Sequence, residues 1–96
     1  RRTSMTALGA SPGEAPKAVI EVRRAAGVAT VVGGGVPVEH RGRGHGQRLG
    51  RQVMAELRAE GCRLVRTAEP PPGPGLRMLL QLGFRPAATG VLELEL

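Results

Sequence analysis

The chain of 96 residues is long enough for one small domain with a modest core. Its formal net charge of +6 suits anionic partners, which include nucleic acid, phosphorylated cofactors and membrane surfaces. Cys62 is the single cysteine and there is no Asp, so these residues contain neither an internal disulfide nor a Ser-His-Asp triad. No apolar run is long enough to span a bilayer, and no signal-peptide pattern is present. We therefore expect a reducing location, the cytoplasm, and no membrane partner.

The first part of the chain is predicted to be a loose segment followed by two strands. Residues 1–16 are small and polar and are interrupted by Pro and Gly, which indicates a loose N-terminal segment with a short helical turn near residues 5–8. The β-branched residues after it predict a strand over 17–24 and a second, antiparallel strand over 28–38. The three glycines at 33–35 indicate a bulge, or a place where another group approaches the main chain.

An amphipathic helix over 47–60 is the clearest element that the sequence predicts. Its apolar residues Leu49, Val53 and Leu57 fall at i, i+4 and i+8, and Gly61 follows as a C-terminal cap. The rest of the chain is predicted to alternate between extended and helical segments: a strand over 62–67, a stiff Pro/Gly loop over 70–75, a helix over 76–82, and extended segments over 84–88 and 91–96.

A loop rich in Gly and Arg lies between the second strand and this helix. It reads Arg41-Gly42-Arg43-Gly44-His45-Gly46. A helix that begins directly after such a loop presents unpaired N–H groups and the positive end of its dipole, and the glycines let a phosphate approach the main chain. The loop does not fit the P-loop, because no Lys follows its glycines, and it does not fit the G-x-G-x-x-G spacing of dinucleotide-binding loops. The sequence therefore predicts a phosphate site of another kind.

The loop resembles the Q/R-x-x-G-x-G/A signature of the GNAT N-acetyltransferase family. Further along, Leu82-Gly83-Phe84-Arg85-Pro86 is similar to a second signature of that family, at the end of the next helix. Both signatures are in register with the predicted order of strands and helices. The resemblance implies an α+β, GNAT-like acyl-CoA N-acyltransferase fold over residues 17–96. That fold is a mostly antiparallel sheet, splayed at the cofactor site, with a helix packed on each side.

The resemblance also implies how acetyl-CoA, the co-substrate, is bound. In the family, main-chain groups of the strand before the loop hold the pantetheine arm, and the loop amides hold the pyrophosphate. The cofactor-binding residues implied here are Val36, Pro37 and Val38 for the arm, and Arg41, Gly42, Arg43, Gly44, His45, Gly46 and Gln47 for the pyrophosphate.

The chain departs from the family in two respects. Many members protonate the leaving thiolate with a Tyr on the second helix, but this chain has no Tyr, and Leu79 occupies that position. A water, Cys62 or a partner would have to serve, or the chain is inactive, so the catalytic residues stay open. The first strand and the two substrate-covering helices of the family also have no counterpart, because residues 1–16 are too short. We expect an open sheet face, completed by a missing N-terminal half or by a partner chain, as in a homodimer.

Other polar residues offer weaker candidates for chemistry. Glu21 and Glu39 are candidate general bases, against the more common role of a solvated surface acid. His45 stands where an aliphatic residue is usual, so it either points towards the core or contacts a phosphate. His40, His45 and Cys62 supply too few ligands, at a spacing that matches no known zinc site, so we expect no metal.

The function that the sequence favours is N-acetyl transfer from acetyl-CoA to an amine, whose identity the sequence does not give. Two alternatives stay open. One is a degenerate, non-catalytic GNAT-like module that binds CoA or a protein partner. The other is a basic nucleic-acid-binding module, which is less favoured because a good helix directly follows the loop.

Overall fold

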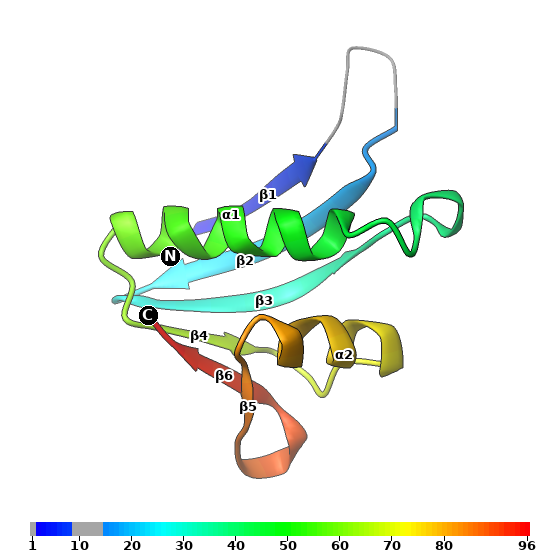
Figure 1. The fold of residues 1–96 in the computed structure, drawn as a ribbon. Helices are drawn as coiled ribbons and strands as arrows, with labels where there is room; N and C mark the ends of the chain where they lie inside the picture. Colours follow the sequence, from blue (N-terminus) through cyan, green and yellow to red (C-terminus); the bar gives the residue numbers. More distant parts are fainter. Residues whose placement is uncertain (1, 9–14) are drawn as a thin grey trace.

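The computed structural model describes residues 2–8 and 15–96, which form one six-stranded sheet and two helices (Figure 1). The elements in chain order are β1 (Arg2–Leu8), β2 (Ala18–Ala25), β3 (Val28–Gly35), the 3-10 turn η1 (Val38–His40), α1 (His45–Ala59), β4 (Leu64–Thr67), α2 (Gly73–Gln81), β5 (Arg85–Pro86), the 3-10 turn η2 (Ala88–Gly90) and β6 (Leu92–Glu95). The strand order is β1-β2-β3-β4-β6-β5, and every neighbouring pair is antiparallel except β3 and β4. The expected α+β fold with a mostly antiparallel sheet is confirmed.

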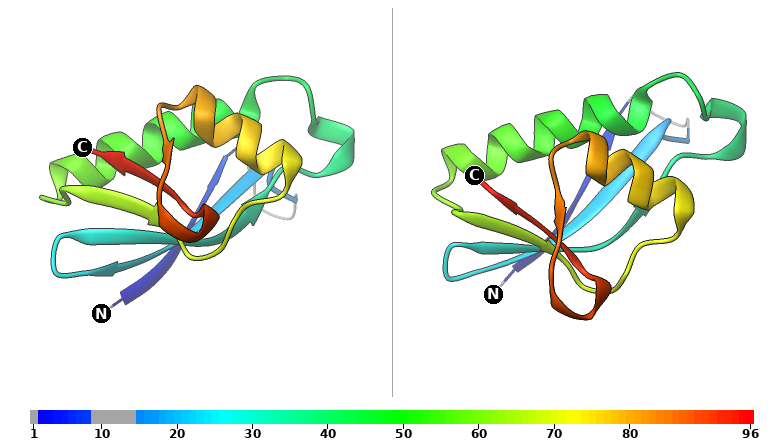
Figure 2. Two further views of the ribbon diagram at one scale, coloured as in Figure 1. Left: turned by 90° about the horizontal axis from the view of Figure 1, so that it is seen from below. Right: turned by 60° about the horizontal axis from the view of Figure 1, so that its bottom comes forward.

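One hydrophobic core lies on a single face of this sheet. Strands and both helices supply its buried members: Ala18, Ile20, Val22, Ala29, Leu49, Val53, Leu57, Val65, Leu79, Phe84 and Leu92. Because α1 and α2 share this core and contact each other, both cover the same face of the sheet (Figure 2). The expectation of one helix on each side of the sheet is therefore wrong. No helix in the described residues is long and apolar enough to cross a membrane.

The opposite face of the sheet, which we call the open face, carries no helix within residues 2–8 and 15–96. Side chains alternate across a strand, so the neighbours of the core residues on β2 point to this face. They include the half-buried Glu21, which lies opposite the exposed Met5 of β1. The expected open sheet face is present in the described part of the chain.

The first strand corrects the prediction for the N-terminal segment. β1 pairs antiparallel with β2 along its whole length, from Arg2 opposite Arg24 to Leu8 opposite Ala18. The predicted loose segment over 1–16, with a helical turn near 5–8, is wrong for residues 2–8; residues 1 and 9–14 lie outside the described residues. No apolar alternation could be read over β1, because its half-buried positions, Ser4 and Thr6, are polar.

Several predicted boundaries also shift. The strand predicted over 28–38 ends at Gly35, and the strand predicted over 62–67 begins at Leu64. α1 begins at His45, before the predicted residue 47, because Gly44 adopts the left-handed conformation that caps it. α2 begins at Gly73 inside the Pro/Gly loop. Pro74 fits the first helical turn, where a missing N–H leaves no hydrogen bond unmade.

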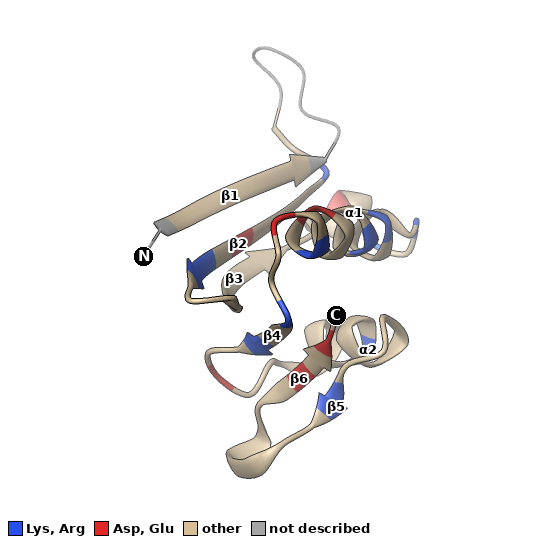
Figure 3. Cartoon of the chain, turned by 90° about the vertical axis from the view of Figure 1, so that its left-hand side faces the viewer, with Lys and Arg blue, Asp and Glu red and all other residues tan. Residues whose placement is uncertain are grey.

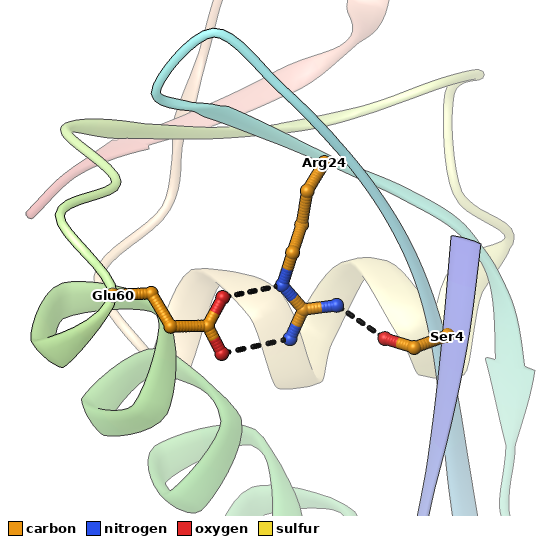
Figure 4. A network of polar contacts seen from close by, with 3 residues as sticks. All are labelled: Ser4, Arg24 and Glu60. Carbon is orange, nitrogen blue, oxygen red and sulfur yellow. Dashed lines mark hydrogen bonds and ion pairs between the residues drawn. The ribbon is translucent and has the colours of Figure 1, made fainter. Parts of the chain in front are cut away.

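A polar link joins the C-terminal end of α1 to the hairpin of β1 and β2 (Figure 4). Nε of Arg24 donates to Oε1 of Glu60 at 2.7 Å, and Nη2 donates to Oε2 at 3.4 Å. Nη1 of the same guanidinium donates to the Ser4 hydroxyl. A partly exposed ion pair of this kind contributes about 0.2–1 kcal/mol, so the link fixes orientation more than it stabilises the fold.

α1 and α2 contact each other through two glycines that lie one helical turn apart. A Cβ on Gly46 would lie 2.7 Å from Sδ of Met78, and a Cβ on Gly50 would lie 2.5 Å from Cδ1 of Leu82. Side-chain carbon atoms do not approach other atoms so closely, so a side chain at either position would force Met78 or Leu82 to move.

We predict that Gly50→Ala is less stable than Gly75→Ala by about 1–3 kcal/mol, because both gain the helix propensity of Ala but only Gly50→Ala displaces Leu82 from a packed contact. Gly75→Ala is the matched control on α2. Its Cβ would meet Pro71 at an ordinary 3.7 Å, so the higher helix propensity of Ala should leave stability unchanged or raise it by up to about 1 kcal/mol. Urea denaturation of both variants measures the difference in their free energies of unfolding. Equal effects of the two substitutions would contradict a tight contact between Gly50 and Leu82.

Candidate functional site

The sheet splits where β4 ends. β3 and β4 pair only from Val28 opposite Leu64 to Val31 opposite Thr67, and one further bond runs from the Ala68 N–H to the Val31 carbonyl. β3 continues to Gly35 with no strand beside it on that side within the described residues. The predicted bulge lies at the same place: Glu21 faces Gly33 and Val22 faces Val31, so Val32 has no partner on β2.

A cavity of about 790 Å³ occupies the split. One wall is the second half of β3 with the glycine run, and the end of the cavity is the loop that leads into α1. The opposite wall is the segment after β4 together with α2, including Glu69, Arg77 and Met78. The glycine contact between α1 and α2 lies at this site, and Nε2 of Gln47 donates to Oε1 of Gln81 across it at 3.0 Å. The packing of the two helices therefore sets the shape of the cavity.

The predicted loop forms the start of α1 with its amides unoccupied. The first hydrogen bond within the helix runs from the Arg48 N–H to the Gly44 carbonyl at 3.0 Å, so the amides of residues 45–47 have no helical partner. No side chain caps the helix, and the amides of residues 42–44 have no hydrogen bond to any described residue. Gly42 and Gly44 both have a φ of 78°, which other residues rarely adopt, and a Cβ on either would meet nothing within 4 Å. The result is a row of free N–H groups at the positive end of a helix.

Residues 36–38, just before the loop, do not continue β3 as predicted. Val38 lies in η1 with 73% of its surface exposed, and the strand has already ended. Protein donors occupy the carbonyls of all three residues from 36 to 38. The donors are Nε of Arg41 to Val36 at 3.0 Å, the His40 N–H to Pro37 at 2.9 Å and the Arg41 N–H to Val38 at 3.2 Å. Each of these carbonyls accepts one protein donor, which leaves its second lone pair free, and Val36 lines the cavity.

Basic side chains surround this end of the molecule, and the first turn of α1 contains no acidic residue. Arg41 and Arg77 line the cavity. Elsewhere, basic and acidic residues both occur on β2 and on α1, and together on the neighbouring strands β4 and β6 (Figure 3). One such neighbouring pair is Arg66 and Glu93, whose Nη2 and Oε2 atoms are 4.0 Å apart. The first turn of α1 thus has no acidic residue, while Glu39 lies in η1 before the loop and Glu69 lines the cavity.

Two histidines meet beside the loop. The rings of His40 and His45 are edge to face, with centroids 6.0 Å apart and planes at 79°. Nδ1 of each ring is buried without a hydrogen-bond partner among the described residues. Partial burial lowers the pKa of His45 below its ordinary value of 6.5, and the positive charges of Arg48, Lys17, His40 and Arg43 lower it further. His45 is therefore neutral near pH 7.

The structure separates most of the other candidate residues from the cavity. Glu39 is exposed in η1, and Glu21 lies on the open face, with Oε1 3.5 Å from where a Cβ on Gly33 would be. Neither residue lines the cavity, whereas Glu69, which the sequence analysis did not single out, does. Glu69 follows β4 and belongs to no sequence motif. Its place at the cavity could have been predicted only from knowing that β4 ends where the sheet splits.

Leu79 lies on α2, and Cys62 follows α1. Leu79 is 6% exposed and faces both the core and the cavity, so no proton donor stands at this position of α2. Cys62 follows the C-terminal end of α1, about 22 Å along a 15-residue helix from His45 at its start. It can therefore neither reach the cavity nor share a metal with His40 and His45. The described residues contain no cluster of three metal-ligating side chains.

Comparison with solved structures identifies the fold. No protein-family profile and no curated protein sequence matches the chain. Tetrahymena GCN5 superposes with a TM-score of 0.81 at 14% identity, over 99% of this chain and 69% of that one. The GNAT domain of S. lividans PAT gives a TM-score of 0.78 at 24% identity, over 98% of this chain and 61% of that one. A Bacillus subtilis acetyltransferase in complex with CoA gives 0.72 at 16% identity, over 88% of this chain and 72% of that one.

These likenesses show that the chain has the fold of the GNAT acetyltransferases. It spans 61% to 72% of the length of the three structures. The expected GNAT-like fold, with a sheet that splits beside a strand-to-helix corner, is confirmed.

We predict that the stability of the protein falls as the pH drops below about 6.5 and that His45→Leu removes much of this loss. The pKa of His45 is lower in the folded than in the unfolded chain, so the unfolded chain binds the proton first and gains stability from it. Stability begins to fall when the pH reaches the pKa of His45 in the unfolded chain. It stops falling below the pKa of His45 in the folded chain. Melting temperatures from pH 5 to pH 8 measure it, and parallel curves for the two proteins would contradict the assignment to His45.

Proposed function

We propose that the chain binds acetyl-CoA in the cavity at the sheet split and transfers the acetyl group to an amine. The observation that carries the proposal is the row of free amides over residues 42–47, where a glycine loop enters a 15-residue helix. Main-chain N–H groups at the positive end of a helix favour phosphate groups. Arg41 and the absence of acidic residues in the first turn favour a doubly charged group such as a diphosphate.

We propose that the pantetheine arm lies along residues 32–35 as well as along Val36, Pro37 and Val38. Residues 32–36 line the cavity along the side of β3 that β4 leaves unpaired. The arm contains two amides, and an amide chain laid along a free strand edge can make the hydrogen bonds of an added strand. The glycines at 33–35 let that chain lie close to the main chain.

In the proposed reaction the nitrogen of the neutral amine attacks the thioester carbonyl. A C–N bond forms, the C–S bond breaks, and CoA leaves as the thiolate. The amine must first lose a proton, and Glu69 is the carboxylate that lines the cavity. After the attack the nitrogen carries one extra proton. Leu79 has no proton to give, so we assign to water the transfer of this proton from the nitrogen to the thiolate.

One observation favours a second function, a module that binds CoA without turnover. The open face leaves the acceptor side of the sheet without a covering element in the described residues, and no proton donor stands on α2. A nucleic-acid-binding module has less support, because acidic residues are interleaved with the basic ones outside the loop (Figure 3). A cytoplasmic location stays a prediction from the sequence.

We predict that acetyl-CoA and CoA raise the melting temperature and that acetyl-pantetheine, which lacks the diphosphate, does not. A ligand at 100 times its Kd stabilises the folded state by about 2.7 kcal/mol, which is a shift of several degrees for a domain of this size. Differential scanning fluorimetry with a short RNA as the control measures it. No shift with any CoA species would remove the proposal, and a shift with RNA alone would favour the nucleic-acid module.

Gly44 and Gly61 provide matched variants for the same experiment. Both have positive φ, of 78° and 93°, and open space where a Cβ would be, and they flank opposite ends of α1. Ala at either position strains the backbone by a similar amount, about 1 kcal/mol. We expect Gly44→Ala to weaken CoA binding at least tenfold, and Gly61→Ala to leave it unchanged. Equal losses of CoA affinity in the two variants would mean that Gly44 affects binding only through the stability of the chain.

We further predict that a primary amine releases free CoA thiol from acetyl-CoA in the presence of the chain. A panel of polyamines, Lys peptides and peptides with free N-termini, followed with a thiol reagent, tests this. Glu69→Gln should reduce kcat/KM, because Gln cannot take a proton from the ammonium form of the amine. CoA binding without thiol release from any amine would favour the non-catalytic module over the transferase.

A further inference from the structure

Thr67 is the last residue of β4 and lies at the point where the sheet splits. It is 5% exposed, and within residues 2–8 and 15–96 it is the one polar residue that is buried to this degree. Because Val65 is buried and Arg66 is exposed, Thr67 lies on the same face of β4 as Val65, which is the face that the helices cover. Thr67 also lines the cavity. A buried hydroxyl therefore borders the space in which the ligand is placed.

The fold uses the oxygen of this hydroxyl but not its proton. The main-chain pairing of β4 with β6 ends at Arg66 opposite Glu93, and the N–H of Leu92 donates to Oγ1 of Thr67 at 3.0 Å. A hydroxyl has one proton to donate and two lone pairs that accept. Thr67 donates to no acceptor in the described part of the chain. Because a buried donor without an acceptor is costly, this proton is available to a molecule in the cavity.

With CoA bound as proposed above, the length of the pantetheine arm brings the sulfur to Thr67. The loop amides lie beside Val36, because a Cβ on Gly46 would be 3.3 Å from Cγ2 of Val36. From the diphosphate to the sulfur the arm has about twelve bonds, or about 14 Å at the roughly 1.2 Å per bond of an extended chain. Residues 36 back to 32 span about 13 Å at about 3.3 Å per residue. The sulfur therefore lies between Val32 and Val31, and Val31 is the residue that pairs with Thr67.

We propose that the Thr67 hydroxyl donates a hydrogen bond to the sulfur of CoA and stabilises the thiolate that leaves during acetyl transfer. This assignment rests on the proposed function. When the C–N bond forms and the C–S bond breaks, the electron pair of the C–S bond stays on the sulfur. The Thr67 proton remains on its own oxygen and stabilises that charge, while the extra proton of the nitrogen reaches the sulfur through water. A donor that is fixed in a buried site before the reaction stabilises developing charge strongly.

Two other cavity residues that the proposed reaction involves cannot donate to the sulfur. Leu79 is apolar, and Glu69 accepts a proton in that reaction. The Leu92 N–H holds Oγ1 of Thr67 in place, and a β-branched side chain has few rotamers, so the hydroxyl is positioned before a ligand arrives. Thr67 therefore supplies from β4 the donor that α2 lacks.

The ionisation of the thiol of bound CoA tests this hydrogen bond without any acetyl transfer. A donor to the thiolate favours the charged form, so Thr67→Val should raise the pKa of the bound thiol by about one unit, a tenfold change in its ionisation. Thr67→Ser keeps the hydroxyl and should keep the lower pKa. The ultraviolet absorbance of the thiolate at saturating CoA measures all three proteins, in a Cys62→Ala background so that no protein thiol contributes.

Thr67→Val also leaves the Leu92 N–H without its acceptor, so the experiment needs a control for lost stability. Val65→Ala removes a buried side chain on the same face of β4, and Val65 does not line the cavity. We expect this variant to lower the free energy of unfolding and to leave the pKa of the bound thiol unchanged. Equal pKa values for the unmodified chain and Thr67→Val, or an equal shift in Val65→Ala, would overturn the role of Thr67.

Turnover provides a second readout with any amine that accepts the acetyl group. Thr67→Val should lower kcat at least tenfold and change KM for acetyl-CoA less than about twofold, and Thr67→Ser should restore most of kcat. An equal loss of kcat in Thr67→Val and Thr67→Ser would contradict the role of the hydroxyl. A chain that binds no CoA would refute the proposed function and the role of Thr67 together. CoA binding with an unshifted thiol pKa in Thr67→Val would refute the role of Thr67 alone.

Discussion

The close approach of α1 and α2 is the contact on which the rest of this structure depends. Gly46 and Gly50 leave no side chain between the helices, so Met78 and Leu82 reach the surface of α1. The contact holds both helices on one face of the sheet and joins them in a single core. It also fixes the distance between the free amides of α1 and the opposite wall of the cavity. The same glycines therefore govern stability and the shape of the site.

The site itself arises from a mismatch in strand length. β3 has eight residues and β4 has four, so the parallel pair separates halfway along β3. The bulge at Val32 falls at the point of separation, where it increases the local twist. The unpaired edge of β3 and the unpaired start of α1 both border the cavity, with residues 36–41 and the turn η1 between them. Main-chain groups that are normally satisfied within a fold are here left free at both places.

The distribution of charge distinguishes the start of α1 from the rest of the molecule. The first turn of α1 contains no acidic residue, and the pKa of His45 is lowered by its partial burial and then by the positive charges near it. Elsewhere acidic and basic side chains offset one another, as in the links from Arg24 to Glu60 and from Arg66 towards Glu93. The net charge of +6 is therefore a poor guide to function, because its meaning depends on where the charges lie.

The sequence by itself determined the features that rest on local chemistry. The apolar period of 49, 53 and 57 predicted α1, the glycine run predicted the bulge, and the loop from 41 to 46 predicted a strand-to-helix corner with free amides. Each of these depends on neighbouring residues along the chain. The tertiary structure alone decided that β1 is a strand, that the strand before the loop ends at Gly35, that both helices share one face, and that Glu69 instead of Glu21 or Glu39 lines the cavity. These outcomes depend on which segments meet across long stretches of chain. Side-chain periodicity cannot report such meetings when the half-buried positions of a strand are polar, as Ser4 and Thr6 are in β1.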